Sequence, residues 1–172
     1  EPVLERSEGK GARGMVEGSL HHHEMWLMRP SARRKVSAVP EFIKLSVTLQ
    51  ATPQQAYEAW LSSQEHTAFT GDEATIDPKL GGKFVAGSGY IRGTTLELEP
   101  YSKIVQSWRS TDFTEAAGDS LLELLLEEAR GGTRLTLVHT NIPDGQGNDY
   151  EQGWKDFYFE PMRRYFSEKG AG

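Results

Sequence analysis

The chain has 172 residues, a net charge of −6, 37% hydrophobic and 26% charged residues, and no cysteine. This length suits one domain, whose core buries about two-thirds of the surface that the unfolded chain exposes. The absence of cysteine excludes disulfides, thiol chemistry and zinc sites built on thiolates. No apolar run approaches the ~20 residues that cross a bilayer, and residues 1–20 lack the apolar stretch of a secretory signal. We therefore expect a cytoplasmic protein that does not enter membranes.

Charge is distributed unevenly along the chain. Residues 1–40 hold 7 Lys and Arg against 5 Asp and Glu, whereas residues 41–172 hold 12 against 20. Nucleic acids and anionic membranes are bound by clusters of cations. The acidic character of residues 41–172 argues against both as partners.

Residues 1–40 differ from the rest of the chain. They are rich in glycine and charge at their start, and His21–His23 then precede a short apolar island, Met25–Met28. Three adjacent histidines are candidate metal ligands, but the nearby sequence supplies no further ligands, so we expect no metal site. We divide the chain into residues 1–40, which form a flexible arm or were introduced by cloning, and one domain over residues 41–172. The island is expected to dock on that domain or on another subunit, and the oligomeric state stays open.

The regular pattern begins with a strand and two short helices. Apolar and polar residues alternate from 43 to 51, as in a half-buried strand. Thr52 and Gln55 form a capping box that predicts a short helix. Ser62 and Glu65 form a second box, so another short helix is expected to follow at once.

Several strands are expected next. The leucine- and glutamate-rich run from 119 to 130 has residues that favour helices. Gly131 and Gly132 follow it, however, and the run after them mirrors its alternation, which predicts a β-hairpin. The expected strands cover residues 83–86, 90–99, 103–110, 119–130 and 133–140.

The last element is a long helix with an aromatic side. Its apolar residues recur at spacings of three and four, so the helix must lie on a large apolar surface. Asn148 and Glu151 are expected to cap its start. Pro161 lies inside it, where a missing backbone donor usually kinks a helix. The apolar side consists of Trp154, Phe157, Tyr158, Met162, Tyr165 and Phe166.

This order of elements is that of the helix-grip, START-like fold. It is an α+β fold in which a curved antiparallel sheet, here of about six or seven strands, surrounds a long C-terminal helix. Within this group the chain resembles the C-terminal domain of the activators of heat-shock protein 90 ATPase. The resemblance extends over residues 43–166 and is carried by Leu80–Phe84, Pro100–Arg109, Thr133–Thr140 and Gly153–Phe166.

The resemblance implies a chaperone as a partner, with one difference. The eukaryotic activators have a separate N-terminal domain thought to do much of the chaperone engagement. In this sequence residues 1–40 precede the resembling stretch, and we expect them to be too short to replace that domain.

A curved sheet that surrounds a helix can enclose a cavity, and large aromatic residues are expected between the two. They would form a pocket of roughly 300–1,000 Å³ for a small hydrophobic or amphipathic molecule. A densely packed core without space is the alternative, and both stay open. The candidate ligand-binding residues are Trp60, Phe69, Phe84, Trp108, Trp154, Phe157 and Tyr158, with Tyr90, Arg92 and His139 as polar contacts.

His139 is the titratable residue of most interest. It shares strand parity with Leu135 and Leu137, so it is expected to point inward, either as a base or polar contact or as a neutral, hydrogen-bonded side chain. His66 is expected at the surface. Arg92 and Tyr90 share strand parity with Leu96, so they are expected to point inward, where Arg92 could bind a carboxylate. The alternative for Arg92 is that it reaches past the edge of the sheet into solvent.

The sequence contains no phosphate loop, nucleophile elbow or metalloprotease motif. We therefore expect a non-catalytic binding protein without cofactor or metal. Two alternatives stay open. One is a protein-interaction module or co-chaperone that stimulates a chaperone ATPase, and the other is a cyclase- or hydrolase-like enzyme that uses His139.

Overall fold

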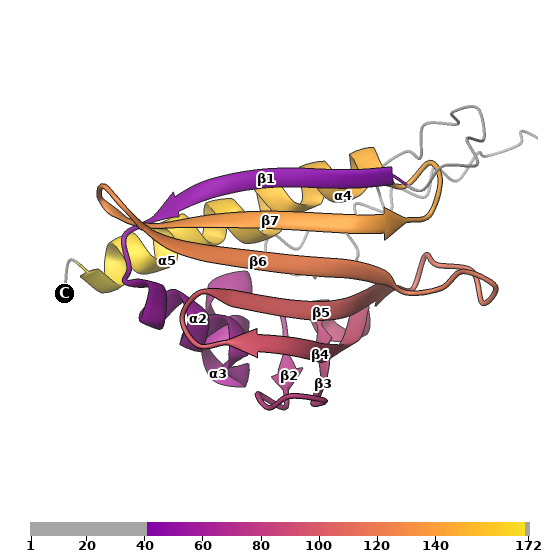
Figure 1. Cartoon of the computed structure of the whole chain (residues 1–172), viewed down its shortest axis with the longest axis horizontal. Coiled ribbons are helices and arrows are strands. Elements are labelled where there is room, and N and C mark those ends of the chain that lie inside the picture. Colours follow the sequence, from indigo (N-terminus) through magenta and orange to yellow (C-terminus); the bar gives the residue numbers. More distant parts are fainter. Residues whose placement is uncertain (1–40, 171–172) are drawn as a thin grey trace, which may run out of the picture.

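A computed structural model describes residues 41–170 (Figure 1). The predictions about residues 1–40 lie outside this range. Seven antiparallel strands form one sheet in the order β1-β7-β6-β5-β4-β3-β2, which confirms the helix-grip fold expected from the sequence. The strands are β1 (Glu41–Leu49), β2 (Thr75–Ile76), β3 (Lys83–Ala86), β4 (Ile91–Glu99), β5 (Lys103–Ser110), β6 (Ser120–Ala129) and β7 (Gly132–Ile142).

The helices cover one face of the sheet. Helix α2 contacts β6 and β7, and α4 and α5 contact β1, so the last helix crosses behind the strands in Figure 1. We call the face under the helices the inner face and the opposite one the outer face. The helical segments are α2 (Pro53–Leu61), α3 (Ser63–Thr70), the short 3₁₀ turn η1 (Gly87–Gly89), α4 (Gly147–Trp154), the π-helical turn η2 (Lys155–Phe159) and α5 (Glu160–Gly170).

The hairpin of β6 and β7 confirms that the leucine- and glutamate-rich run is a strand. Leu124 pairs with Leu137, and both side chains are fully buried on the inner face. The adjacent pair, Glu123 and Val138, lies on the outer face, because successive side chains of a strand point to opposite sides. Turn glycines and alternation therefore override the helical preference of leucine and glutamate.

The first capping box is present in full. Thr52 Oγ1 accepts a hydrogen bond from the Gln55 amide, and Gln55 Oε1 accepts one from the Thr52 amide. Ser62 caps α3 in the same way by accepting from the Glu65 amide. The Glu65 carboxylate instead accepts hydrogen bonds from Tyr165 at 2.8 Å and Lys169 at 2.6 Å. Glu65 therefore ties α3 to α5.

The predicted cap of the last helix is wrong. Helix α4 begins at Gly147, so Asn148 lies inside its first turn, and Gln146 at the N-cap makes no side-chain cap bond. The carboxylate of Glu41, at the start of β1, accepts hydrogen bonds from the amides of Gly145 and Gly147. A helix N-terminus favours such an anion. The residue that fills this role lies more than 100 positions away in sequence, so no local pattern could reveal it.

The irregularity expected at Pro161 is a widened turn. The Glu160 amide donates to the Lys155 carbonyl, five residues back, so η2 is a π-helical turn directly before the proline. Such turns insert one extra residue into an α-helix. Three consecutive side chains, those of Phe157, Tyr158 and Phe159, are thereby buried at 4%, 4% and 6% exposure.

None of the helices within residues 41–170 is both long and apolar enough to span a membrane. This agrees with the absence of a long apolar run in the sequence.

Candidate functional site

The interior between sheet and helix contains nine of the ten predicted site residues. Each of the nine has 6% or less of its surface exposed. The rings contact one another over the length of the core: the centroids of Trp60 and Tyr158 lie 5.3 Å apart, and those of Trp154 and Tyr158 lie 4.8 Å apart. The nine are Trp60, Phe69, Phe84, Tyr90, Trp108, His139, Trp154, Phe157 and Tyr158.

The aromatic side chains nearly fill this interior. The void that remains has a volume of about 10 Å³, which is about the minimum that holds one water molecule. Ligand pockets are usually 300–1,000 Å³ in volume. The described residues therefore leave no room for a ligand in this conformation, and binding by these side chains stays a prediction that requires the core to open. The void is lined by Trp60, His66, Ile76, Phe84, Ala86, Ile91, Gln106, Trp108, Leu122, Trp154 and Tyr158.

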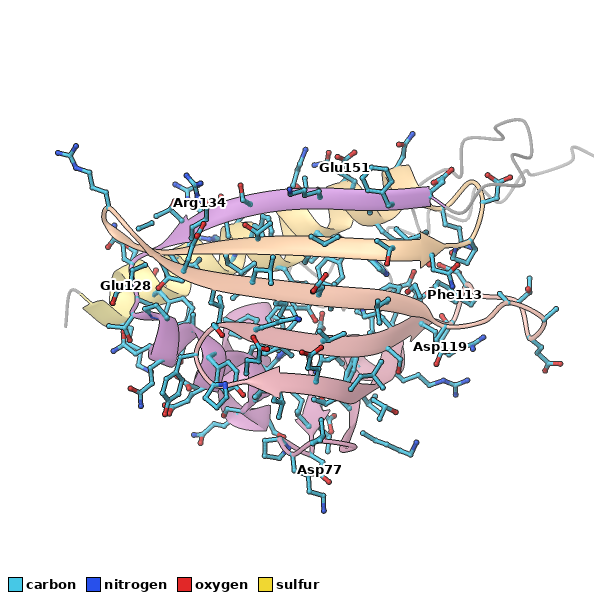
Figure 2. All side chains as sticks on the ribbon, viewed as in Figure 1. Asp77, Phe113, Asp119, Glu128, Arg134 and Glu151 are labelled. Carbon is cyan, nitrogen blue, oxygen red and sulfur yellow. The ribbon has the colours of Figure 1, made fainter. Side chains whose placement is uncertain are left out.

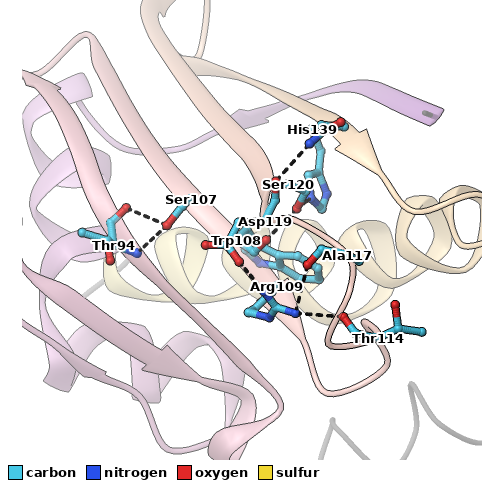
Figure 3. A network of polar contacts seen from close by, with 10 residues as sticks. Thr94, Ser107, Trp108, Arg109, Thr114, Ala117, Asp119, Ser120 and His139 are labelled. Carbon is cyan, nitrogen blue, oxygen red and sulfur yellow. Dashed lines mark hydrogen bonds and ion pairs between the residues drawn. The ribbon is translucent and has the colours of Figure 1, made fainter. Parts of the chain in front are cut away.

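His139 points inward as predicted, and hydrogen bonds use both of its ring nitrogens. Figure 3 shows His139 beside Ser120 and Trp108. Trp154 Nε1 donates to Nδ1 at 3.1 Å, so the proton resides on Nε2. Nε2 lies 2.7 Å from Ser120 Oγ, which in turn donates to the Trp108 carbonyl. Burial lowers the pKa of His139 to about 3.

This arrangement matters for the enzyme alternative. A base that activates a serine needs a free lone pair facing the hydroxyl, whereas Nε2 of His139 carries the proton. Both side chains are also buried, with 2% of Ser120 and none of His139 exposed. Ser120 and His139 therefore form a hydrogen-bonded structural network and are not arranged as a nucleophile and its base.

His66 is buried, so its predicted surface position is wrong. Nδ1 lies 2.8 Å from the Trp60 carbonyl, which can only accept, so Nδ1 carries the proton. Nε2 then accepts from the Tyr158 hydroxyl at 2.9 Å. Burial lowers the pKa of His66 to about 4. The sequence offered one signal: His66, Phe69 and Thr70 are spaced as one helix face, and all three are buried.

Arg92 points away from the interior, so its predicted inward orientation is wrong. A register shift between Thr95 and Glu97 marks a bulge in β4. The expected parity was taken from Leu96, but the bulge separates Leu96 from Leu98, which packs against the core. Leu96 is itself 50% exposed, and Arg92 shares its outward parity. Gly93 faces inward instead, because a Cβ there would collide with the ring of Phe84.

The hydrogen bonds made by Gln106 and by Tyr90 were not predicted. Gln106 accepts from the indole of Trp60 at 3.1 Å and donates to Thr95 at 3.1 Å. Its parity with Ile104 and Trp108 could have indicated its inward position. At the other end of the core the Tyr90 hydroxyl donates to Asp112 at 2.6 Å, and burial raises the pKa of Tyr90.

Two larger recesses lie at the surface. A groove of about 420 Å³, which we call the α5 groove, lies between α5, the end of β1 and the β6–β7 turn. A second hollow of about 250 Å³ lies beside Arg92 and Arg109. Residues 41–170 contain no group of three or more His, Cys, Asp or Glu side chains that could hold a metal ion. The α5 groove is lined by Thr48, Gln50, Gly131, Glu160, Arg163, Arg164, Ser167 and Glu168.

Solved structures share this fold. An HSP90 activator from Plasmodium falciparum superimposes with a TM-score of 0.65 at 25% identity, over 73% of this chain and 96% of that one. A protein from Chromobacterium violaceum superimposes with a TM-score of 0.60 at 26% identity, over 74% of this chain and 98% of that one.

The chain is also similar in sequence to curated proteins. A Dictyostelium discoideum protein named activator of 90 kDa heat shock protein ATPase homolog is 30% identical over 125 residues, which is 73% of this chain and 33% of that protein. The human activator homolog 1 is 29% identical over 124 residues, 72% of this chain and 36% of that protein. The chain thus spans about a third of the length of these relatives. Residues 50–167 match the family described as Activator of Hsp90 ATPase homolog 1-like protein, and the chain belongs to this family.

Proposed function

We propose that this chain is a protein-interaction module that binds a chaperone of the 90 kDa heat-shock class and raises its rate of ATP hydrolysis. The observation that carries this proposal is the interior void of about 10 Å³, because an interior without space for a ligand leaves the protein surface as the place where a partner binds. Membership of the activator family supports it, as do the names of the relatives from Dictyostelium and human. A small hydrophobic ligand, the other function expected from the sequence, would first have to displace packed aromatic rings.

The α5 groove is the contact surface that we infer for the chaperone. It combines two cations, Arg163 and Arg164, with two carboxylates, Glu160 and Glu168. The ion pair between Arg163 and Glu160 spans 3.2 Å, and its side chains are 59% and 55% exposed. An exposed pair of this kind contributes little to stability, so a charged partner can replace it at low cost.

The test is steady-state ATP hydrolysis by the chaperone from the same organism, with and without the whole chain. We expect a saturable rise in turnover that weakens as salt is raised, because salt screens contacts between exposed charges. Changing Arg163→Glu together with Arg164→Glu should reduce the affinity about tenfold.

A matched control places the same charge change elsewhere. Lys79 and Lys83 are exposed and lie in and beside the β2–β3 connection, so Lys79→Glu with Lys83→Glu should leave stimulation unchanged. Unaltered ATP turnover at saturating concentrations of the unmodified chain would refute the proposal. Equal losses in both double variants would refute the α5 groove as the contact while keeping the function.

A further inference from the structure

The outer face of the sheet carries an apolar cluster with one carboxylate at its centre. Glu123 pairs with Val105 on β5 and with Val138 on β7. Leu121 and Leu125, two positions before and after Glu123 on β6, share its face and are each 38% exposed. Figure 2 views this face from the front. We call these four apolar residues around Glu123 the outer cluster.

Val105 shows that the cluster packs within itself. Only 7% of Val105 is exposed, yet this residue is absent from the main hydrophobic core. Its diagonal neighbours on β6 are Leu121 and Leu125, within reach across adjacent strands. The outer cluster is therefore an apolar surface of its own, and no helix among the described residues covers it.

The surroundings of the outer cluster are negative. Lys103 lies 3.2 Å from Glu97 and 3.8 Å from Glu123, and Glu99 is its cross-strand partner. Lys44 on β1 is exposed and lies opposite Val138, so it is a second cation beside the outer cluster. Three carboxylates thus face two cations. The hydrogen bond to Glu97, with Glu99 and Glu123 nearby, raises the pKa of Lys103. The surface suits an apolar segment that carries positive charge.

Residues 25–35 of this chain have that composition. The island Met25-Trp26-Leu27-Met28 is followed by Arg29, Arg33, Arg34 and Lys35, and residues 25–40 contain no carboxylate. We call residues 25–35 the basic arm segment. Its composition complements both the apolar side chains and the excess carboxylates of the outer cluster.

The connection is long enough for this contact. Thirteen peptide steps join Met28 to Glu41 and span up to about 40 Å when extended. Strand β1 is separated from β6 by β7 alone, so the cluster lies roughly 10 Å from β1 across the sheet. Phe42, at the start of β1, is 71% exposed and alternates with the buried Ile43, so its side chain lies on the outer face.

A second copy of the chain fits the outer cluster less well. Two copies related by a two-fold axis would place identical patches against each other. The Glu123 carboxylates of the two copies would then lie close together near the axis and repel each other. A tethered segment, in contrast, is present at millimolar effective concentration, and weak contacts suffice to hold it.

We propose that the basic arm segment docks on the outer cluster of its own chain. Its apolar island covers Leu121 and Leu125, and its cations face Glu97, Glu99 and Glu123. This proposal is independent of chaperone stimulation.

Tryptophan fluorescence tests the docking directly. Trp60, Trp108 and Trp154 are 3%, 1% and 0% exposed, so acrylamide quenching of the whole chain reports mainly on Trp26. Trp26→Phe supplies the background of the three buried rings. We expect Trp26 to be quenched about threefold less than in a free peptide of residues 20–36, since a tethered segment is mostly docked.

Variants locate the docking site. Leu121→Ser with Leu125→Ser should raise quenching of Trp26 to the level of the peptide, and circular dichroism checks that the fold persists. If the double variant unfolds, Glu123→Gln replaces it as the test, and we expect it to raise the quenching of Trp26 by a smaller amount. Leu80→Ser is the matched control, because Leu80 is 64% exposed and lies in the turn before β3.

Three results would overturn the proposal. Quenching of the unmodified chain equal to that of the peptide means that the segment does not dock. Protection that survives both outer-cluster variants places the segment elsewhere. Protection of Trp26 that disappears on dilution means that the outer cluster is covered by a second copy of the chain, or by the basic arm segment of another copy.

Discussion

Replacing Trp154 with alanine is expected to lower the free energy of unfolding by about 3–5 kcal/mol, the usual cost of deleting a large buried aromatic side chain. Trp154 has no exposed surface and packs against Trp60, Trp108 and Tyr158. Its indole also satisfies Nδ1 of His139, so the change leaves a buried acceptor without this donor. Equilibrium unfolding in urea measures the loss.

Leu96 provides the matched control for Trp154. It is a large apolar residue with 50% of its surface exposed on the outer face, and Leu96→Ala should cost about 0.5 kcal/mol or less. A loss well below 1 kcal/mol for Trp154→Ala would mean that the ring faces an open pocket or solvent. That result would contradict the filled core.

The stability of the protein should fall steeply as pH drops from 6.5 to 4.5. The folded-state pKa is about 4 for His66 and about 3 for His139, in both cases because burial disfavours the charged ring. In the unfolded chain both titrate near 6.5. Below that pH the unfolded state binds protons that the folded state does not, so stability is fully present above pH 6.5 and is lost on acidification. Two such groups give a slope of about 2–3 kcal/mol per pH unit.

Urea unfolding at a series of pH values measures this slope. His66→Gln and His139→Gln should each reduce it by about half, whatever they do to the stability at pH 7. Comparison of slopes separates the titration from the cost of the substitution. Unfolding free energies that stay constant between pH 6.5 and 4.5 would contradict the buried, neutral state of both rings.

The fold was predictable because its signals are local. Alternation marks β1, β5 and the β6–β7 hairpin, and the glycines at 131 and 132 fix the turn between β6 and β7. The aromatic spacing from Trp154 to Phe166 identifies the last helix and its buried side. Each signal extends over a few residues and reflects one period, of two or of about 3.6 residues.

The errors share a different physical origin. The bulge in β4 places Leu96, the reference residue for Arg92, on the opposite face from Leu98, and no composition change announces it. The burial of His66 depends on Tyr158, which is 92 positions away. The cap on α4 comes from Glu41 on another element. These features depend on how elements meet in space, which a single sequence does not record.

The volume of the interior was the decisive quantity that the sequence left open. The same aromatic residues can line a pocket or fill it, and the difference is a matter of side-chain packing. Trp60, Gln106 and Thr95 illustrate how the space is used, because their hydrogen bonds cross from α2 to the sheet. The packed rings and these bonds together shift the expected site of recognition from the interior to the surface.

Native mass spectrometry of the whole chain, purified without detergent, tests the filled interior most directly. We predict the mass of the polypeptide alone, because a void of about 10 Å³ accommodates no molecule larger than water. A discrete additional mass that is released on gentle activation, and that is absent from Trp108→Ala, would contradict the account. It would show that the aromatic core opens to hold a ligand.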